Sequence, residues 1–274
     1  MSRHALILTA ALLTPAACTA PPAPSAPGAA AVFAGASGRW VDLTHPFSSS
    51  SIYWPTANGF VLDTVAFGQT EGGWFYSAFD FRAAEHGGTH LDAPIHFAEG
   101  RMAADEIPLS QLIGAAAVVD LSERAGPDDQ VQVADLEAWE ARHGRLPDGV
   151  ILLLRTGWGN RYGDRSAYLG TDVTGPEAVP LLHFPGLHPD AARWLVAERA
   201  VGAVGIDTPS IDHGQSATFE SHQILYGADI PGFENVAGLE QLPEQGAFVV
   251  ALPMKIEGGS GGPLRIVAFV PERT

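Results

Sequence analysis

Three of the ten histidines of this 274-residue chain lie in the segment HGGTHLDAPIHF, residues 86–97. His86, His90 and His96 share this segment with one acidic residue, Asp92. Neutral imidazole and carboxylate groups are the ligands that divalent cations such as Zn²⁺ and Mn²⁺ accept in proteins. One histidine alone is usually an ordinary core or surface residue, but three histidines with an aspartate at this spacing favour a metal site.

The spacing of His86 and His90 resembles that of zinc proteases, in which two histidines four residues apart bind the metal from one helical face. Here, however, Gly87 and Gly88 lie between the two histidines, and glycine weakens a helix. Pro94 also disfavours a helical conformation at the residue before it. An extended or irregular segment is therefore expected.

An extended chain has a period of two residues, which predicts that His90, Asp92 and His96 face the same side. His96 follows the carboxylate and would be free to act as a general base. A catalytic cation needs further ligands or an open position for water. The later segment HQILYGADIPGFENV offers His222 and, twelve residues on, Glu234, a pair that would mean little without the first motif.

The elements that must position these residues are mostly strands. Apolar and alternating runs predict strands at 39–44, 60–67, 75–81, 115–121, 149–156, 203–208, 248–254 and 265–271. Helical spacing and end signals predict helices at 133–144, 188–201 and 216–228. We therefore expect an α/β fold that is sheet-rich, with mixed strands and a few covering helices in one domain.

The N-terminus predicts export. Arg3 and His4 precede the apolar run ALILTAALL, residues 5–13, which is too short to cross a bilayer and is followed by small residues. Cys18 follows two alanines, as in a bacterial lipoprotein cleavage box, but Pro15 stands where leucine is usual. The sequence thus leaves simple export and lipidation of Cys18 both open.

These signals divide the chain into a signal peptide over residues 1–18, which could be a lipoprotein signal, a Pro/Ala-rich tether over 19–37 and a folded domain over 38–274. We expect a bacterial protein that is either periplasmic or anchored to the outer membrane. With 46% hydrophobic and 17% charged residues, the composition is that of a globular protein. The net charge of −16 and the lack of a Lys/Arg cluster exclude nucleic acid as a partner, and they leave a lipid on Cys18 as the only route to a membrane. Cys18 is also the only cysteine, which excludes an internal disulfide and thiol catalysis.

The segment GGSGG, residues 258–262, matches the G-x-S-x-G pattern of serine hydrolases. That pattern requires a helix directly after it, with an aspartate and then a histidine further along the chain. Instead, a predicted strand follows, and no histidine lies beyond His222. We therefore predict a turn between two strands and no serine mechanism.

Residues 86–97 match H-x-G-T-H-x-D-x-P-x-H-F, a pattern of the cyclase-like metal hydrolases that include kynurenine formamidase and isatin hydrolase. The chain resembles this family over nearly all of its length after residue 39. Further matching segments are YWP (53–55), LLRTGW (153–158), GIDTPSID (205–212), HQILYGADIPGFENV (222–236) and PMKIEGGSGGPLRIVAF (253–269).

The resemblance implies a cyclase-like metal hydrolase domain of the swivelling β/β/α type that assembles as a homodimer or homotetramer. It implies one or two divalent cations, Mn²⁺ or Zn²⁺, with Asp92 bridging in the two-metal case. It also implies a role for each of eight residues: His86, His90 and Asp92 as ligands of the first cation, His222 and Glu234 as additional ligands, His96 as the catalytic histidine, Trp54 as a residue that stacks on the substrate, and Asp207 as a support outside the ligand set.

The expected reaction is hydrolysis of the C–N amide bond of a small aromatic amide, either an isatin-like lactam or an N-formylkynurenine-like arylformamide. A divalent cation lowers the pKa of a bound water to about 7, and His96 would accept the proton of that water. Trp74 and Phe97 could add to an aromatic wall, but core packing is the favoured interpretation for both. The alternative function is an exported binding protein that holds a metal and a small ligand without turnover.

Overall fold

The computed structural model describes residues 38–272. The predicted signal peptide, the tether and Cys18 lie outside these residues, so their assignment and the domain boundary at residue 38 stay predictions. Within the described part of the chain, no helix is both long and apolar enough to span a membrane.

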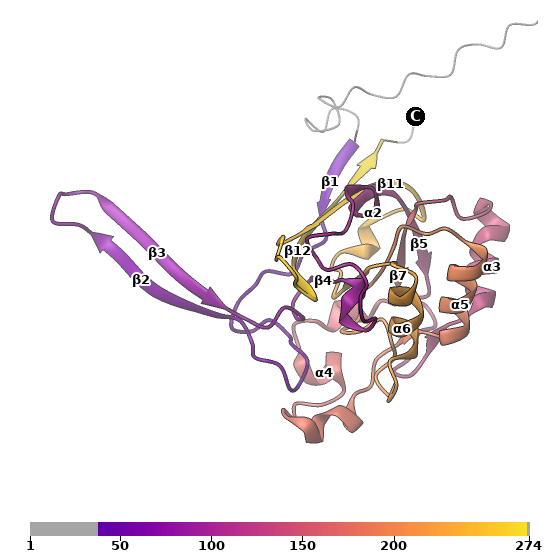
Figure 1. Ribbon diagram of the computed structural model, residues 1–274, viewed down its shortest axis with the longest axis horizontal. Coiled ribbons are helices and arrows are strands. Elements are labelled where there is room, and N and C mark those ends of the chain that lie inside the picture. The colour runs from indigo at the N-terminus through magenta and orange to yellow at the C-terminus, as the bar shows by residue number, and fades with distance from the viewer. Residues whose placement is uncertain (1–37, 273–274) are drawn as a thin grey trace, which may run out of the picture.

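A mixed sheet forms the centre of the fold, with strands in the order β1-β12-β11-β5-β7-β9-β10-β4. Strand β4 also pairs with β12, so seven of these strands close into a barrel, and β1 continues the sheet beside β12 (Figure 1). The strands are β1 (Gly38–Asp42), β4 (His90–Asp92), β5 (Ile113–Asp120), β7 (Ile151–Arg155), β9 (Ala203–Ile206), β10 (Gly232–Glu234), β11 (Gln245–Pro253) and β12 (Gly261–Pro271).

Strands β5, β7, β9 and β10 run parallel, and helices cover their outer face. Alternate residues of β7 therefore enter two cores: Leu153 packs inside the barrel with β11 and β12, whereas Leu152 packs toward the helices. This double burial explains why the strand reads as one continuous apolar run. The helices are α2 (Leu109–Leu112), α3 (Val133–His143), α4 (Arg165–Leu169), α5 (Pro189–Glu198) and α6 (Glu220–Gly227), and the short pair β6 (Gln130–Val131) and β8 (Gly186–Leu187) completes this side.

The predicted strand-rich α/β fold is confirmed, and each predicted strand and helix is present within a few residues of its expected bounds. The first three residues of the GGSGG segment lie in the connection between β11 and β12, where a turn was predicted, and its last two glycines begin β12. Strand β10 was not predicted, because three residues are too few to show a period, whereas β4 lies in the segment that was expected to be extended or irregular. Closure into a barrel was not predicted either, because it depends on the pairing of β4 with β12. The swivelling β/β/α classification stays a prediction.

Strands β2 (Val61–Gln69) and β3 (Phe75–Arg82) form a hairpin that projects away from the barrel, which we call the arm (Figure 1). The strand register places Leu62, Phe67, Phe75, Phe79 and Phe81 on one face of the arm, and each is 43–70% exposed. Trp74 lies at the turn of the arm and is 63% exposed. Its predicted core packing is therefore wrong, because the hairpin carries it away from the core.

His45, a histidine outside the predicted site, gives a prediction for stability. It stacks face to face on Tyr162, with 3.6 Å between the ring centroids. Burial lowers the pKa of His45 from 6.5 to about 4, although Glu240 acts in the opposite direction. Because the unfolded chain then binds this proton more readily than the native state, the stability that neutral His45 contributes should be fully present above pH 6.5 and should be lost as the pH decreases toward 4.

Replacing His45 by Phe keeps an aromatic ring against Tyr162 and removes the titrating nitrogen. We expect the stability of this variant to depend less steeply on pH between pH 4 and 6.5 than that of the wild type, because the contribution of His45 is gone; urea unfolding across that range measures the difference. The exposed histidine variant His183→Gln is the control and should keep the wild-type slope. Equal slopes for His45→Phe and the wild type would contradict the assignment.

Candidate metal centre

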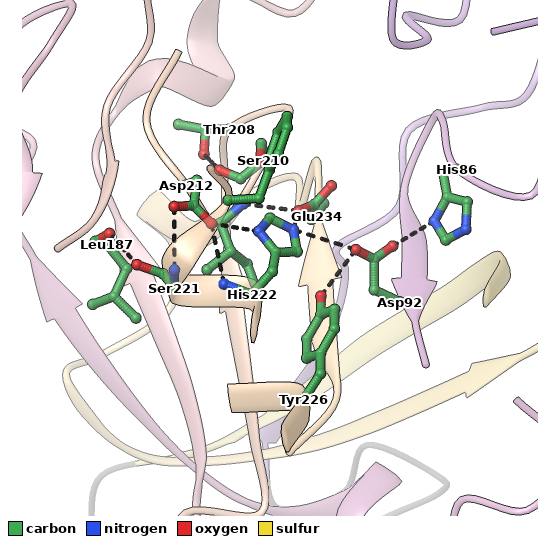
Figure 2. A network of polar contacts seen from close by, with 12 residues as sticks. His86, Asp92, Leu187, Thr208, Ser210, Asp212, Ser221, His222, Tyr226 and Glu234 are labelled. Carbon is green, nitrogen blue, oxygen red and sulfur yellow. Dashed lines mark hydrogen bonds and ion pairs between the residues drawn. The ribbon is translucent and has the colours of Figure 1, made fainter. Parts of the chain in front are cut away.

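The fold brings all five predicted metal ligands to one end of the barrel. Strand β4 carries His90 and Asp92, and β10 pairs with it so that Glu234 lies opposite His90. His222 comes from α6, and His86 comes from the loop between β3 and β4. Figure 2 shows His86 and His222 on either side of the Asp92 carboxylate, with Glu234 next to His222.

The ligand atoms form two overlapping groups. One group is His86, His90 and Asp92, and the other is Asp92, His222 and Glu234; within each group the donor atoms lie within 4.8 Å of one another. Asp92 belongs to both groups. A nitrogen and oxygen donor set of this kind suits Zn²⁺ or Mn²⁺, and the shared carboxylate allows one ion or two.

The clearest sign that a cation fits comes from His90, which is buried. Its Nδ1 lies 3.0 Å from the carbonyl oxygen of Gly88, to which it donates, and Gly88 adopts the left-handed conformation (φ +60°) that this bend of the chain requires. Its Nε2 has no hydrogen-bond partner among residues 38–272, yet it lies 3.1 Å from Asp92 Oδ1 and 3.3 Å from Glu234 Oε2. A buried imidazole nitrogen that converges with two carboxylates, while the other ring nitrogen donates to a carbonyl, is the arrangement of a metal ligand.

Two residues that the sequence analysis missed hold the ligands in place. Asp212 accepts a hydrogen bond from His222 Nδ1 at 2.5 Å and another from its backbone amide at 3.1 Å. Tyr226 donates its hydroxyl to Asp92 Oδ2 at 2.9 Å (Figure 2). Tyr226 could have been found, because it follows His222 by four residues on a predicted helix and therefore shares its face. No local spacing pointed to Asp212.

Charge within the cluster favours a cation. Burial alone would raise the pKa of Asp92, but His86 and the other two histidines hold it well below its usual value. Burial alone would lower the pKa of His90, but the carboxylates of Asp92 and Glu234 raise it to about 10. The two carboxylates therefore demand positive charge, which either imidazole protons or a divalent cation can supply.

His96 lies beside the cluster, on the short 3₁₀-helix Pro94–His96. Its ring stacks on that of His86, with 3.7 Å between the centroids. Burial is the main reason that the pKa of His96 falls to about 4, so the ring is neutral at pH 7 and able to accept a proton.

The cluster opens into a cavity of about 300 Å³. Its wall includes His96 and four aromatic residues, Tyr53, Trp54, Phe97 and Phe219. Trp54 meets Phe219 edge to face at 5.9 Å, and its role as a residue that stacks on the substrate stays a prediction. Phe97 both packs against the core and borders the cavity, so the core-packing interpretation described only half of its environment. Phe219 was not predicted; it directly precedes α6 and has a left-handed backbone (φ +51°), a conformation that is uncommon for non-glycine residues.

Asp207, predicted to support the ligands, is buried directly after β9, and its side chain reaches the turn after β7. Its carboxylate accepts hydrogen bonds from Thr156 Oγ1 at 2.6 Å and from the amide of Gly157 at 2.8 Å. It is linked to the site only indirectly, because Tyr168 donates to both the Asp207 carbonyl and the side chain of Asn235, the neighbour of Glu234. Its role toward the metal stays a prediction.

Several known proteins are similar to this chain in sequence and in fold. A family model described as "Putative cyclase" matches residues 41–213. An isatin hydrolase of Roseibium aggregatum is 37% identical over 198 residues, which cover 69% of this chain and 73% of the relative. A kynurenine formamidase of Salinibacter ruber is 28% identical over 227 residues, which cover 83% of this chain and 95% of the relative. The solved structure of isatin hydrolase A from Ralstonia solanacearum has a TM-score of 0.77 and 36% identity, and the match covers 88% of this chain and 95% of that one.

Proposed function

This chain belongs to that cyclase family, and we propose that it is a metal-dependent hydrolase of the C–N amide bond in small aromatic amides. The substrate is either an isatin-like lactam or an N-formylkynurenine-like arylformamide, the substrate classes that the names of two relatives indicate. One observation carries the proposal: the buried ligand set opens directly into an aromatic cavity whose wall also holds His96.

When bound by His86, His90, Asp92, His222 and Glu234, a divalent cation supplies Lewis acidity for the amide carbonyl and acidity for a water molecule. The side chains of the cavity transfer the proton and bind the substrate. The neutral ring of His96 accepts the proton of the attacking water and returns it to the leaving nitrogen. Trp54, Phe97 and Phe219 bind the flat face of the substrate and exclude bulk water from the reacting carbonyl.

The proposal is tested by loading the purified protein with Mn²⁺ or Zn²⁺ and assaying isatin and N-formylkynurenine. Turnover of at least one substrate that is lost on chelation and restored by metal is the expected result. The alternative, an exported binding protein, predicts that aromatic amides bind but that none is converted across a broad panel. The position of His96 beside the cavity favours the enzyme, because a binder needs no general base.

Trp54 provides a test of the aromatic wall. Trp54→Ala removes a half-buried ring that contacts Phe184 and Phe219, so we expect KM to rise roughly tenfold to a hundredfold with a smaller change in kcat. Trp54→Phe keeps an aromatic surface and should stay within a few-fold of the wild type. Steady-state kinetics of the two variants measure this. If kcat fell while KM stayed constant, Trp54 would act on the chemistry rather than on binding.

We also propose that the protein assembles with a second copy of itself through the arm. An isolated two-stranded hairpin is at best marginally stable in water, and the five apolar side chains on one face of this arm are uncovered among the described residues. Half-exposed aromatic rings leave roughly 100 Å² each. Five such side chains on each of two arms expose roughly 1,000 Å² in total. The surfaces that cover them would bury a similar area, so the interface would bury roughly 2,000 Å², enough for a stable homodimer. Ala84, just after the arm, lines the cavity, so the contact would border the active site.

The assembly is tested by size-exclusion chromatography with light scattering, which measures the molar mass of the protein in solution. The wild type should have the mass of a dimer or of a dimer of dimers. A double variant, Phe67→Ser with Phe79→Ser, breaks the aromatic pair at the centre of the apolar face and should shift the mass to that of a monomer. Tyr76→Ser removes an exposed aromatic ring from the opposite face and should leave the mass unchanged. A monomeric wild type, or a double variant of unchanged mass, would contradict the proposal.

Export, with or without lipidation at Cys18, completes the proposal. It rests on the basic start, the apolar run over 5–13 and the small residues before Cys18. Fractionation of cells that express the full chain tests it. Cys18→Ser should move the protein from membranes to the soluble exported fraction if the cysteine is lipidated, and should change nothing if export is simple.

A further inference from the structure

The serine of the GGSGG segment lies directly behind a metal ligand. Ser260 Oγ lies 2.9 Å from Nε2 of His86. Both the hydroxyl and the backbone amide of Ser260 donate to Oε2 of Glu85, at 2.5 and 3.1 Å. These three residues form a hydrogen-bonded chain, Glu85–Ser260–His86, on the side of the His86 ring that faces away from the cluster.

The chemistry of these groups sets the direction of each hydrogen bond. A carboxylate only accepts, so the Ser260 hydroxyl donates its proton to Glu85. The serine oxygen must then accept from His86 Nε2–H. A proton fixed on Nε2 leaves Nδ1 as the nitrogen with a lone pair, and Nδ1 is the atom that faces Asp92, 2.6 Å from its Oδ1.

The glycines of the segment make this close approach possible. A Cβ at residue 261 would lie 2.6 Å from Cε1 of His86 and 2.4 Å from the carbonyl oxygen of Leu91. A Cβ at residue 259 would lie 2.8 Å from Oε1 of Glu85. Real Cβ atoms do not tolerate such distances, so larger residues on either side of Ser260 would displace it from His86. The turn therefore serves as a cradle for the imidazole as well as a connection between strands.

We propose that Ser260 and Glu85 are positioning residues that fix the ring orientation and the tautomer of His86 for metal binding. The inference rests on the proposed function only in that His86 is a ligand. It also reaches His96, because the His86 ring is held between the Ser260 segment and the stacked ring of His96. Hydrogen bonds from the outer nitrogen of a ligand histidine typically change metal affinity by about 10- to 100-fold.

The test compares the binding of Mn²⁺ and Zn²⁺ to the metal-free wild type and variants by titration calorimetry. Ser260→Ala removes the hydroxyl alone, because the loop stays anchored by its carbonyl, which accepts from the amide of Ala93. We expect this variant to bind metal about 10- to 100-fold more weakly. Glu85→Ala should weaken binding in the same direction, whereas Glu85→Gln keeps an acceptor oxygen and should restore most of the affinity.

The chain offers a matched control. Ser122 donates both its hydroxyl and its amide to Asp120, at 2.7 and 2.9 Å, and so repeats the serine–carboxylate geometry with no ligand histidine attached. Ser122→Ala should bind metal like the wild type. The melting temperatures of the metal-free Ser260→Ala and wild-type proteins should agree, while the rise in melting temperature on metal addition should be smaller for the variant.

Wild-type affinity in Ser260→Ala, or equal losses in Ser260→Ala and Ser122→Ala, would overturn the positioning role. These outcomes are separate from the fate of the proposed function. If the wild type hydrolyses no aromatic amide but Ser260→Ala still weakens metal binding, the reaction is wrong and the positioning role stands. If the wild type is active and Ser260→Ala binds metal normally, the proposed reaction stands and the positioning role is wrong.

Discussion

Asp92→Asn is expected to abolish metal-dependent turnover, with a loss in kcat/KM of roughly 10³-fold or more. Asp92 is the one residue common to both ligand groups, and its carboxylate contacts His86, His90, His222 and Tyr226. An amide is uncharged and offers a single acceptor oxygen, so it cannot serve both groups. Metal content by elemental analysis and steady-state kinetics measure the two parts of this prediction.

The Asp92→Asn variant also leaves buried histidines without their carboxylate partner, which can destabilise the fold. Thermal unfolding and circular dichroism of the metal-free variant therefore accompany the assay. Asp128→Asn, which removes an exposed carboxylate that pairs with His183, is the control and should keep full activity. A folded Asp92→Asn protein that retains metal and wild-type kinetics would rule out Asp92 as a bridging ligand.

The second large effect is expected at His96. His96→Ala should lower kcat by about 10²- to 10⁴-fold, the usual contribution of a general base, while the affinity for metal stays near the wild-type value. The reason for this division is that His96 borders the cavity but belongs to neither ligand group. Added imidazole should restore part of kcat by entering the space left by the ring.

Three measurements separate this role from a structural one: metal titration, KM and imidazole rescue. His183→Ala, which removes an exposed histidine, should match the wild type in all three. If His96→Ala lost metal affinity in proportion to its activity, His96 would be a ligand or a support for one, and the assignment as a base would be wrong. Full activity in the variant would place the proton transfer on another group.

Much of the local structure could be read from the sequence, because it depends on backbone preferences and periodicity. Gly88 and Pro94 excluded a helix through residues 86–97, and the chain there forms strand β4 followed by a single 3₁₀ turn that begins at Pro94. The apolar runs became buried strands, and the helix predicted over 216–228 contains α6. Each of these outcomes is set by residues within a few positions of one another.

The period-two argument for His96 held only in part. His90 and Asp92 both face the cluster from β4, but the strand ends at Asp92 and His96 lies on the following 3₁₀ turn. His96 comes close to the cluster by stacking on His86, a residue that precedes the strand. Proline at the start of the turn ended the extended geometry on which the argument depended.

The residues that complete the site depend on contacts between distant parts of the chain. Glu234 lies opposite His90 because β10 pairs with β4, and Ser260 reaches His86 because β12 pairs with the other edge of β4. Tyr226 meets Asp92 in the same way, through the packing of α6 against the barrel, whereas Asp212 reaches His222 from a loop only ten residues earlier in the chain. The pairing of strands that are more than 100 residues apart cannot be predicted from the spacing of neighbouring residues. The sequence therefore predicted the ligand types and the chemistry, whereas the closure of the barrel around β4 determined which side chains hold them in place.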